Sequence, residues 1–217
     1  MPANKFRHYS LADRIIGHVD QALYDVFCEQ RASRANPSDS AEEKEALAPT
    51  QSKKAASLMR VNHAGEVCAQ ALYHGQSLTA RDSSLRDKLR QASNEESDHL
   101  AWCRSRLSEL DSRPSYLDPL LYAGSMAIGT AAGILGDRWN LGFLAETEHQ
   151  VVRHLDSHLA RLPQQDAKSR AIVSQMREDE LGHAELAENL GAAELPKPVK
   201  SLMHLTAKVM TTLTERI

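Results

Sequence analysis

Two four-residue stretches, Glu96-Ser97-Asp98-His99 and Glu180-Leu181-Gly182-His183, decide the fold that this sequence predicts. Each reads Glu-x-x-His, and residues i and i+3 of a helix share a face, so each stretch directs a carboxylate and an imidazole to one point. Glu66 lies 30 residues before Glu96, and Glu148 lies 32 residues before Glu180. The repeated Glu…Glu-x-x-His pattern supplies the set of metal ligands found at two-metal carboxylate sites in four-helix bundles.

The composition favours one sizeable all-α domain. The chain has 217 residues, of which 41% are hydrophobic, 25% are charged and only 5% are aromatic. A chain of this length can bury a polar site inside an apolar shell. The net charge of −3 argues against nucleic acid as a partner. Three widely spaced cysteines indicate reduced thiols, and residues 1–5 lack an apolar secretory signal, so we expect a cytoplasmic protein.

The first fifty residues are interpreted as an appendage. Apolar residues recur there at helical spacing and predict an amphipathic helix; they are Leu11, Ile15, Val19, Leu23 and Val26. Residues 31–51 are rich in Ala, Ser, Pro and Glu without periodicity, which predicts a flexible linker. We therefore divide the chain into 1–50, the helix with its linker, and 51–217, the domain with the metal site.

Four amphipathic segments carry the repeated pattern, with approximate bounds 52–80, 84–110, 139–162 and 166–190. In each segment the glutamate of the pattern falls on the apolar stripe, so helical phase separates candidate ligands from neighbouring acidic residues. Glu95, for example, is rotated about 100° from Glu96 and is expected to face solvent. The six candidate metal ligands are Glu66, Glu96, His99, Glu148, Glu180 and His183.

Two further segments are expected to add helices. Residues 119–136 contain no charged side chain but are rich in glycine and alanine, which favours a tightly packed or membrane-dipping crossover helix over a true membrane span. After Pro196 and Pro198 a last amphipathic helix is predicted. It would pack on the bundle or attach to a membrane surface, and the sequence leaves both alternatives open.

Four carboxylates on apolar stripes need compensation, because buried like charges are costly. Two divalent cations would balance them, and carboxylate with imidazole suits iron or manganese better than zinc. A di-iron(II) pair can deliver two electrons to O2. By analogy with such sites, Glu96 and Glu180 would bridge the metals. Asp179 and Glu95 could each accept the second N–H of a ligating histidine, and Asp179 is favoured in that role.

The residues around these ligands resemble the demethoxyubiquinone hydroxylase family. The match is carried by Arg60-Val61-Asn62-His63-Ala64-Gly65-Glu66, Glu95-Glu96-Ser97-Asp98-His99, Glu148 with His154, and Asp179-Glu180-Leu181-Gly182-His183. The resemblance is to family members of bacterial type. It implies a ferritin-like bundle with a carboxylate-bridged centre of two iron ions. It also implies that His154 lies in the pocket or beside the ligands.

The resemblance further implies a monooxygenase of ubiquinone biosynthesis that uses O2 and an external reductant. Its substrate would be a polyprenylated 3-methyl-6-methoxy-1,4-benzoquinol. We therefore expect peripheral attachment to the cytoplasmic side of the inner membrane, partner proteins of the same pathway and a homo-oligomer. The alternatives are a ferritin-like iron store and a peroxide-scavenging di-iron protein. A tRNA hydroxylase would need a basic face, which the charge balance does not favour.

Overall fold

A computed structural model describes residues 11–28, 30–43 and 45–217, and over these residues every regular element is a helix. The structure does not describe residues 1–5, where we expect no secretory signal. It also leaves out the side chains of Leu11, Ile15 and Val19. The prediction of an all-α fold is confirmed. The elements are α1 (Leu11–Phe27), the short 3₁₀ helix η1 (Pro37–Ser40), α2 (Pro49–Thr79), α3 (Ser83–Glu109), α4 (Asp118–Ile134), α5 (Asp137–Arg161), α6 (Ala167–Asn189) and α7 (Lys197–Thr214).

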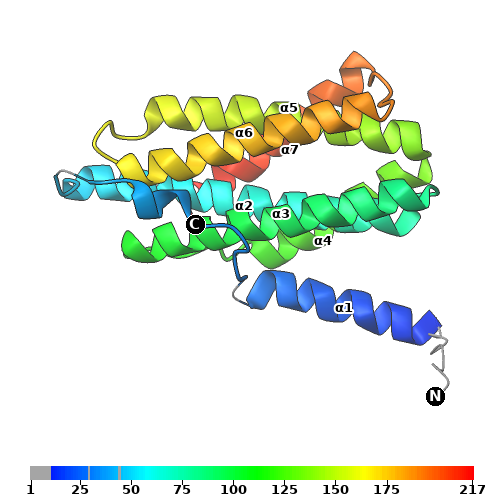
Figure 1. Ribbon diagram of the computed structural model, residues 1–217, viewed down its shortest axis with the longest axis horizontal. Coiled ribbons are helices and arrows are strands. Elements are labelled where there is room, and N and C mark those ends of the chain that lie inside the picture. The colour runs from blue at the N-terminus through cyan, green and yellow to red at the C-terminus, as the bar shows by residue number, and fades with distance from the viewer. Residues whose placement is uncertain (1–10, 29, 44) are drawn as a thin grey trace.

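The bundle is built from two helical hairpins, α2–α3 and α5–α6, joined by α4 (Figure 1). The Asp82 and Asp166 side chains begin α3 and α6 by accepting hydrogen bonds from backbone N–H groups of the first helical turn. Gly191 ends α6 with a φ of 94°, a left-handed conformation that glycine adopts without strain. The arrangement is consistent with a ferritin-like helical bundle.

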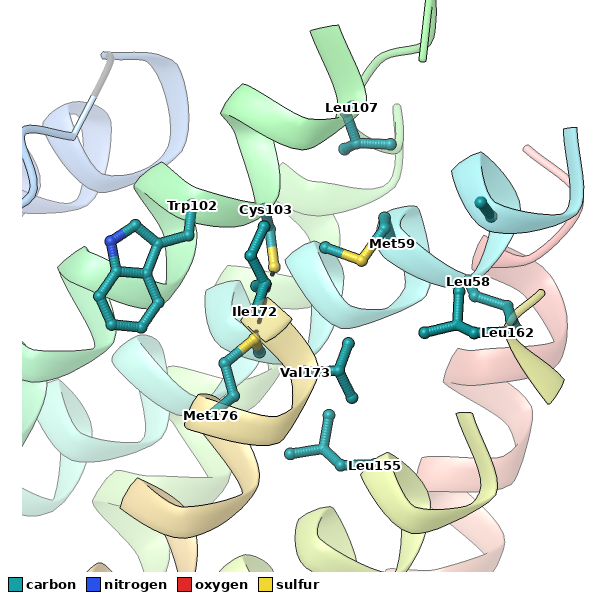
Figure 2. Close-up of a cluster of buried hydrophobic side chains, with 11 residues drawn as sticks. Leu58, Met59, Trp102, Cys103, Leu107, Leu155, Leu162, Ile172, Val173 and Met176 are labelled. Carbon is teal, nitrogen blue, oxygen red and sulfur yellow. Dashed lines mark hydrogen bonds between the residues drawn. The ribbon is translucent and has the colours of Figure 1, made fainter. Parts of the chain in front are cut away.

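The described residues form three buried apolar clusters, two of which lie toward opposite ends of the bundle. Figure 2 shows the first, which includes Met59, Cys103 and Met176. Along their helices these residues lie within two turns of Glu66, His99 and Glu180. The second surrounds Tyr73, Leu89 and Leu144 on the other side of the candidate ligands. Burying each large apolar side chain contributes about 1.5–3 kcal/mol. The candidate ligands therefore lie in a buried polar layer between these two apolar clusters.

The uncharged segment forms α4, which packs along α2 through glycines. A Cβ on Gly129 would lie 2.4 Å from the Leu72 carbonyl oxygen, so only glycine allows this approach. The opposite face of α4 exposes Leu120 and Ile128, and Leu135 just beyond it is also exposed. Among the described residues, none of the helices combines the length and apolar character that crossing a bilayer requires.

The chain segments that flank the bundle also contact it. α7 lies on α2 and α5, where Lys200 pairs with Glu146 at 3.2 Å, yet it exposes Leu202, Leu205 and Val209. Residues 30–43, called the strap below, return from α1 toward the start of α2 (Figure 1). Their contacts with α3 and α6, described below, were not anticipated from their composition. The division of the chain at residue 50 stays a prediction.

Candidate metal centre

The six candidate ligands come from four helices and converge in the polar layer. Glu66 lies on α2, Glu148 lies on α5, and α3 and α6 each supply one Glu-x-x-His pair. All six side chains are buried, and the exposed fraction is largest for His183, at 8%. Ligand atoms of Glu66, Glu96, His99 and Glu180 lie within 4.8 Å of one another. This buried Glu/His group is compatible with a metal centre.

Both histidines present Nδ1 to this group. His99 Nδ1 lies 3.0 Å from Glu96 Oε2, 3.4 Å from Glu66 Oε2 and 3.3 Å from Glu180 Oε1. His183 Nδ1 lies 3.1 Å from Glu180 Oε2 and 3.4 Å from Glu96 Oε1. Each imidazole therefore meets several carboxylate oxygens at one nitrogen, the arrangement that a cation between them requires.

Glu96 and Glu180 each span both histidines. In each carboxylate one oxygen faces His99 and the other faces His183. Two positions for a cation, one beside each imidazole, would thus share these two carboxylates. Glu66 faces the His99 position, whereas the charge of Glu148 acts on His183.

Each of the four glutamates has one buried oxygen without a hydrogen-bond partner in the described structure. These atoms are Glu66 Oε2, Glu96 Oε1, Glu148 Oε2 and Glu180 Oε1. Unsatisfied buried carboxylate oxygens are costly, and such atoms call for an explanation such as an ion. Three of these oxygens lie 3.3–3.4 Å from a histidine Nδ1 in ion-pair contacts, whereas Glu148 Oε2 has no such contact. Carboxylate oxygens that no hydrogen bond satisfies are compatible with metal coordination.

The pKa shifts of the clustered glutamates and histidines also fit a site that binds a cation. Burial raises the pKa of Glu96 and Glu148, and the negative charge of Glu180 raises it further. Burial opposes ionisation of Glu180 too, but hydrogen bonds from His183 and His99 outweigh it and lower its pKa to about 2. Burial opposes a proton on His183, yet its hydrogen bond to Glu180 and the nearby carboxylates raise its pKa to about 11. Without a cation the cluster retains protons, which a divalent metal would displace.

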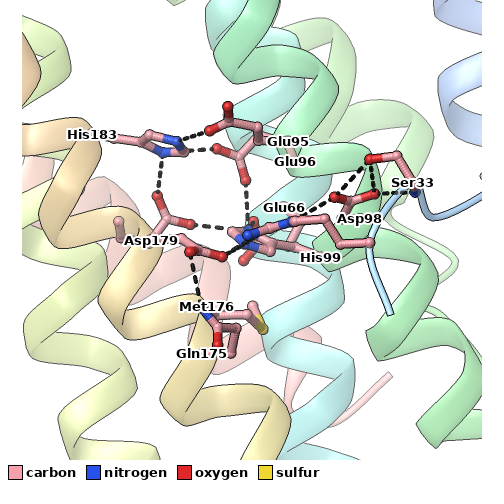
Figure 3. Close-up of polar contacts among 12 residues, drawn as sticks. Ser33, Glu66, Glu95, Glu96, Asp98, His99, Gln175, Met176, Asp179 and His183 are labelled. Atoms are coloured by element: carbon pink, nitrogen blue, oxygen red, sulfur yellow. Dashed lines mark hydrogen bonds and ion pairs between the residues drawn. The ribbon is translucent and has the colours of Figure 1, made fainter. Parts of the chain in front are cut away.

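Carboxylates behind the imidazoles hold the other ring nitrogen of each histidine. His99 Nε2 donates to Asp179 Oδ2 at 2.9 Å, as favoured from the sequence, and His183 Nε2 donates to Glu95 Oε2 at 2.7 Å (Figure 3). Ionised carboxylates only accept, so Nε2 carries the proton and Nδ1 is left for a metal. The expectation that Glu95 simply faces solvent is corrected: its side chain is 38% exposed, but it also contacts His183.

Sequence reasoning missed two other polar side chains at the cluster, Tyr73 and Arg34. Tyr73 Oη donates to Glu148 Oε1 at 2.8 Å from within the second apolar cluster. Arg34 in the strap contacts Asp98 and Asp179. Tyr73 shares a helical stripe with Glu66 and could have been found from that phase, whereas no periodic signal marks Arg34.

The described contacts of His154 are with other residues than the six candidate ligands. Its ring packs against the His158 ring at a tilt of 57°, with centroids 3.9 Å apart, and His158 Nδ1 donates to Asn62 Oδ1 at 2.7 Å. Burial, with the charge of Arg161, lowers the pKa of His154 to about 4. None of the described hydrogen bonds or ion pairs of His154 joins it to a candidate ligand, so its place beside the ligands stays a prediction.

A cavity of about 760 Å³ opens between α1, α2 and α3. Its lining includes Tyr73, Arg86, Leu89 and Ser93. Tyr73 therefore forms part of the cavity wall and donates its hydroxyl to Glu148. A cavity of this volume is within the range of small-molecule sites.

The fold and the cluster together define a class, the helical-bundle proteins whose interior carries a Glu/His site compatible with metal. A family model described as "Ubiquinone biosynthesis protein COQ7" matches residues 53–214, and the chain belongs to this family. The resemblance inferred from the motifs is thereby confirmed.

Bacterial relatives match along nearly their whole length. A protein of Chromobacterium violaceum named 3-demethoxyubiquinol 3-hydroxylase is 59% identical over 201 residues, which is 93% of this chain and 97% of the relative. Proteins with the same name from Laribacter hongkongensis and Ralstonia pickettii are 56% and 52% identical, covering 92% and 95% of this chain and 97% and 100% of their own lengths.

Proposed function

We propose that the chain is an O2-dependent monooxygenase that hydroxylates the ring of a polyprenylated 3-methyl-6-methoxy-1,4-benzoquinol in ubiquinone biosynthesis. The family match and the names of the relatives support the hydroxylation and its pathway. They favour this reaction over the iron-storage and peroxide-scavenging alternatives. The structural observation that carries the proposal is the pair of carboxylates, Glu96 and Glu180, that span two buried imidazoles.

The cofactor in this proposal is a pair of iron ions held by the six candidate ligands. Two iron(II) ions would supply two electrons and a place for O2 to react. One atom of O2 becomes the oxygen of the new ring hydroxyl, and the other leaves as water. The overall reaction consumes two electrons and two protons, which an external reductant supplies. Asp179 and Glu95 orient the histidines, Tyr73 orients Glu148, and the two apolar clusters flank the site.

The cavity beside Tyr73 supports a route for the substrate ring. It combines an apolar side chain, Leu89, with polar ones such as Ser93 and Arg86. Such a mixed lining suits a quinol headgroup, whose ring is apolar and whose oxygens form hydrogen bonds. The ring would approach the cluster along Tyr73.

The polyprenyl tail of the substrate calls for work at a bilayer. Exposed apolar side chains along α7 and along the outer face of α4 support peripheral attachment, for which we propose the cytoplasmic side of the inner membrane. Lys208 on α7 would add attraction to anionic lipids. The homo-oligomer and the partner proteins of the same pathway stay predictions.

The proposal is tested in a bacterial strain that lacks this protein. We expect the strain to accumulate the methoxy-quinone that lacks one ring oxygen, and the wild-type chain to restore ubiquinone. Glu180→Ala and His183→Ala should fail to restore it and should bind less than two irons per chain, with helix content retained. Normal ubiquinone in the deleted strain, or full iron content and turnover in either variant, would refute the assignment.

A further inference from the structure

The strap is fixed to the two helices that carry Glu-x-x-His. Ser33 donates its backbone N–H to Asp98 Oδ1 at 2.6 Å, and Glu43 pairs with the buried Arg106 of α3 at 2.5 Å. Arg106 also pairs with Asp166 at the start of α6, at 2.8 Å. Two separate attachments thus hold residues 33–43 across α3 and α6.

Arg34 lies at the first of these attachments and reaches the candidate metal centre. Its Nε donates to Asp98 Oδ2 at 2.7 Å, and a terminal nitrogen donates to Asp179 Oδ2 at 2.8 Å. The guanidinium also lies over the Trp102 ring, 4.8 Å from its centroid. A planar fork can meet two carboxylates in this way, whereas an ammonium acts as a point charge.

Asp179 connects Arg34 to a candidate ligand. The same oxygen, Oδ2, accepts from Arg34 and from His99 Nε2, while Oδ1 accepts from Gln175 at 3.0 Å. The Asp98 and Asp179 side chains are 2% and 16% exposed, whereas the Arg34 side chain is 38% exposed, so the carboxylates of these contacts are largely sheltered from water and the guanidinium only in part. The orientation of the His99 ring is therefore fixed by three elements, namely α3, α6 and the strap.

The His183 half of the centre has no such brace. Glu95, the acceptor for His183 Nε2, is 38% exposed, and its other hydrogen bond comes from Gln91 at 3.2 Å on the same helix. No Arg or Lys pairs with Glu95 in the part of the chain that the structure describes. The two halves share the Glu-x-x-His pattern but differ in what holds their histidines.

We propose that Arg34 is a positioning residue that makes the two metal positions unequal, with the tighter position beside His99. This inference rests on the proposed two-metal function. Groups that orient a ligating histidine change metal affinity by about 10–100-fold when they are removed. Arg34 acts through Asp179 and also contacts the His99 ring directly, with its Nη2 3.4 Å from His99 Nε2, so its loss would leave His99 free to turn within the pocket.

The test is stepwise Fe(II) binding to the full chain, measured by competition with a chelator. The wild-type chain should bind two ions with distinct dissociation constants. Arg34→Gln should weaken the tighter step by about tenfold or more, and Glu95→Gln should weaken the other step instead. Arg34→Lys should restore the tighter step only in part. Arg31→Gln, at an exposed arginine of the same strap, is the matched control and should change neither step.

Co(II) absorption at one equivalent and thermal unfolding of the metal-free chain complete the test. A positioning role predicts an altered Co(II) spectrum in Arg34→Gln with an unfolding midpoint close to that of Arg31→Gln. Unchanged dissociation constants, or equal weakening of both steps together with a large loss of stability, would overturn the inference while leaving the two-metal function intact. A wild-type chain that binds no second ion would overturn both.

Discussion

Glu95 Oε2 and His183 Nε2 lie 2.7 Å apart and join α3 to α6 behind the candidate metal centre. The second such pair, Asp179 with His99, joins the same helices in the opposite direction. Each Glu-x-x-His helix therefore also supplies the carboxylate that holds the histidine of the other helix. This exchange makes the relative position of α3 and α6 part of the geometry of the site.

The exchange predicts graded effects when either carboxylate becomes an amide. Asp179→Asn should lower iron affinity by about 10–100-fold, because His99 loses a sheltered, charged acceptor. Glu95→Gln should lower iron affinity by a smaller factor, because the Glu95 side chain is partly exposed and water can accept the hydrogen bond from His183 in its place. Iron titrations of both variants, with the exposed Glu178→Gln on α6 as control, check the order. A larger loss in Glu95→Gln than in Asp179→Asn would contradict it.

The cluster itself should destabilise the metal-free protein. Burial and the charge of Glu180 raise the pKa of Glu96, so at neutral pH folding must add a proton to Glu96 or bury another charge. Glu96→Gln removes this cost and should raise the metal-free unfolding free energy by about 1–3 kcal/mol, while abolishing the stabilisation that iron gives.

The sign of the pH dependence provides a second check on Glu96. A carboxyl whose folded pKa lies above its unfolded value lowers stability as pH rises above that unfolded value, 4.5. The advantage of Glu96→Gln should therefore grow between pH 5 and pH 8. Calorimetry of the metal-free proteins at several pH values measures it. A gain that is constant with pH would show that ionisation of Glu96 is not the cause.

Helical phase recovered the buried stripes and all six converging side chains because each signal lies within one helix. It misplaced Glu95, since a glutamate beside the inward stripe is long enough to reach across to α6. It could not find Arg34, whose partners Asp98 and Asp179 lie far along the chain. Contacts between distant segments leave no periodic trace, which is why the composition of residues 31–51 predicts only a flexible linker.

The cavity beside Tyr73 predicts a variant that separates substrate binding from metal binding. Ser93→Trp should fill part of the cavity and raise KM for the quinol by about tenfold, the effect of losing roughly 1.4 kcal/mol of binding. Its iron content should match that of the wild type. Ser108→Trp, at an exposed position farther along α3, serves as the control. An unchanged KM in Ser93→Trp would exclude this route for the ring.

The exposed face of α7 predicts how the protein meets a bilayer. Leu202 and Leu205 are 64% and 57% exposed, and their joint replacement by serine should weaken binding to phosphatidylglycerol-containing vesicles by at least about tenfold. Leu186→Ser, at an exposed leucine of α6, should have little effect. Co-sedimentation measures the difference. Equal binding of the double variant and the wild type would show that the protein attaches to the bilayer through a surface other than α7.

Two glycines of α4 provide a matched pair for testing its packing on α2. A Cβ at Gly129 would lie 2.4 Å from the Leu72 carbonyl oxygen, whereas nothing lies within 4 Å of a Cβ at Gly124. Gly129→Ala should therefore force the helices apart and lower the unfolding free energy by about 1–3 kcal/mol. Gly124→Ala should raise it by up to about 1 kcal/mol, because alanine favours the helix.

The consequence of the Gly129 change should extend to the metal centre. Leu72 and Glu66 lie on the same helix, α2, so a displaced α2 would move Glu66 away from His99. We expect Gly129→Ala to lose iron as well as stability, and Gly124→Ala to keep its full iron content. Chemical denaturation with metal analysis measures both quantities. Equal stability of the two variants would show that α4 does not pack on α2 through Gly129 in solution.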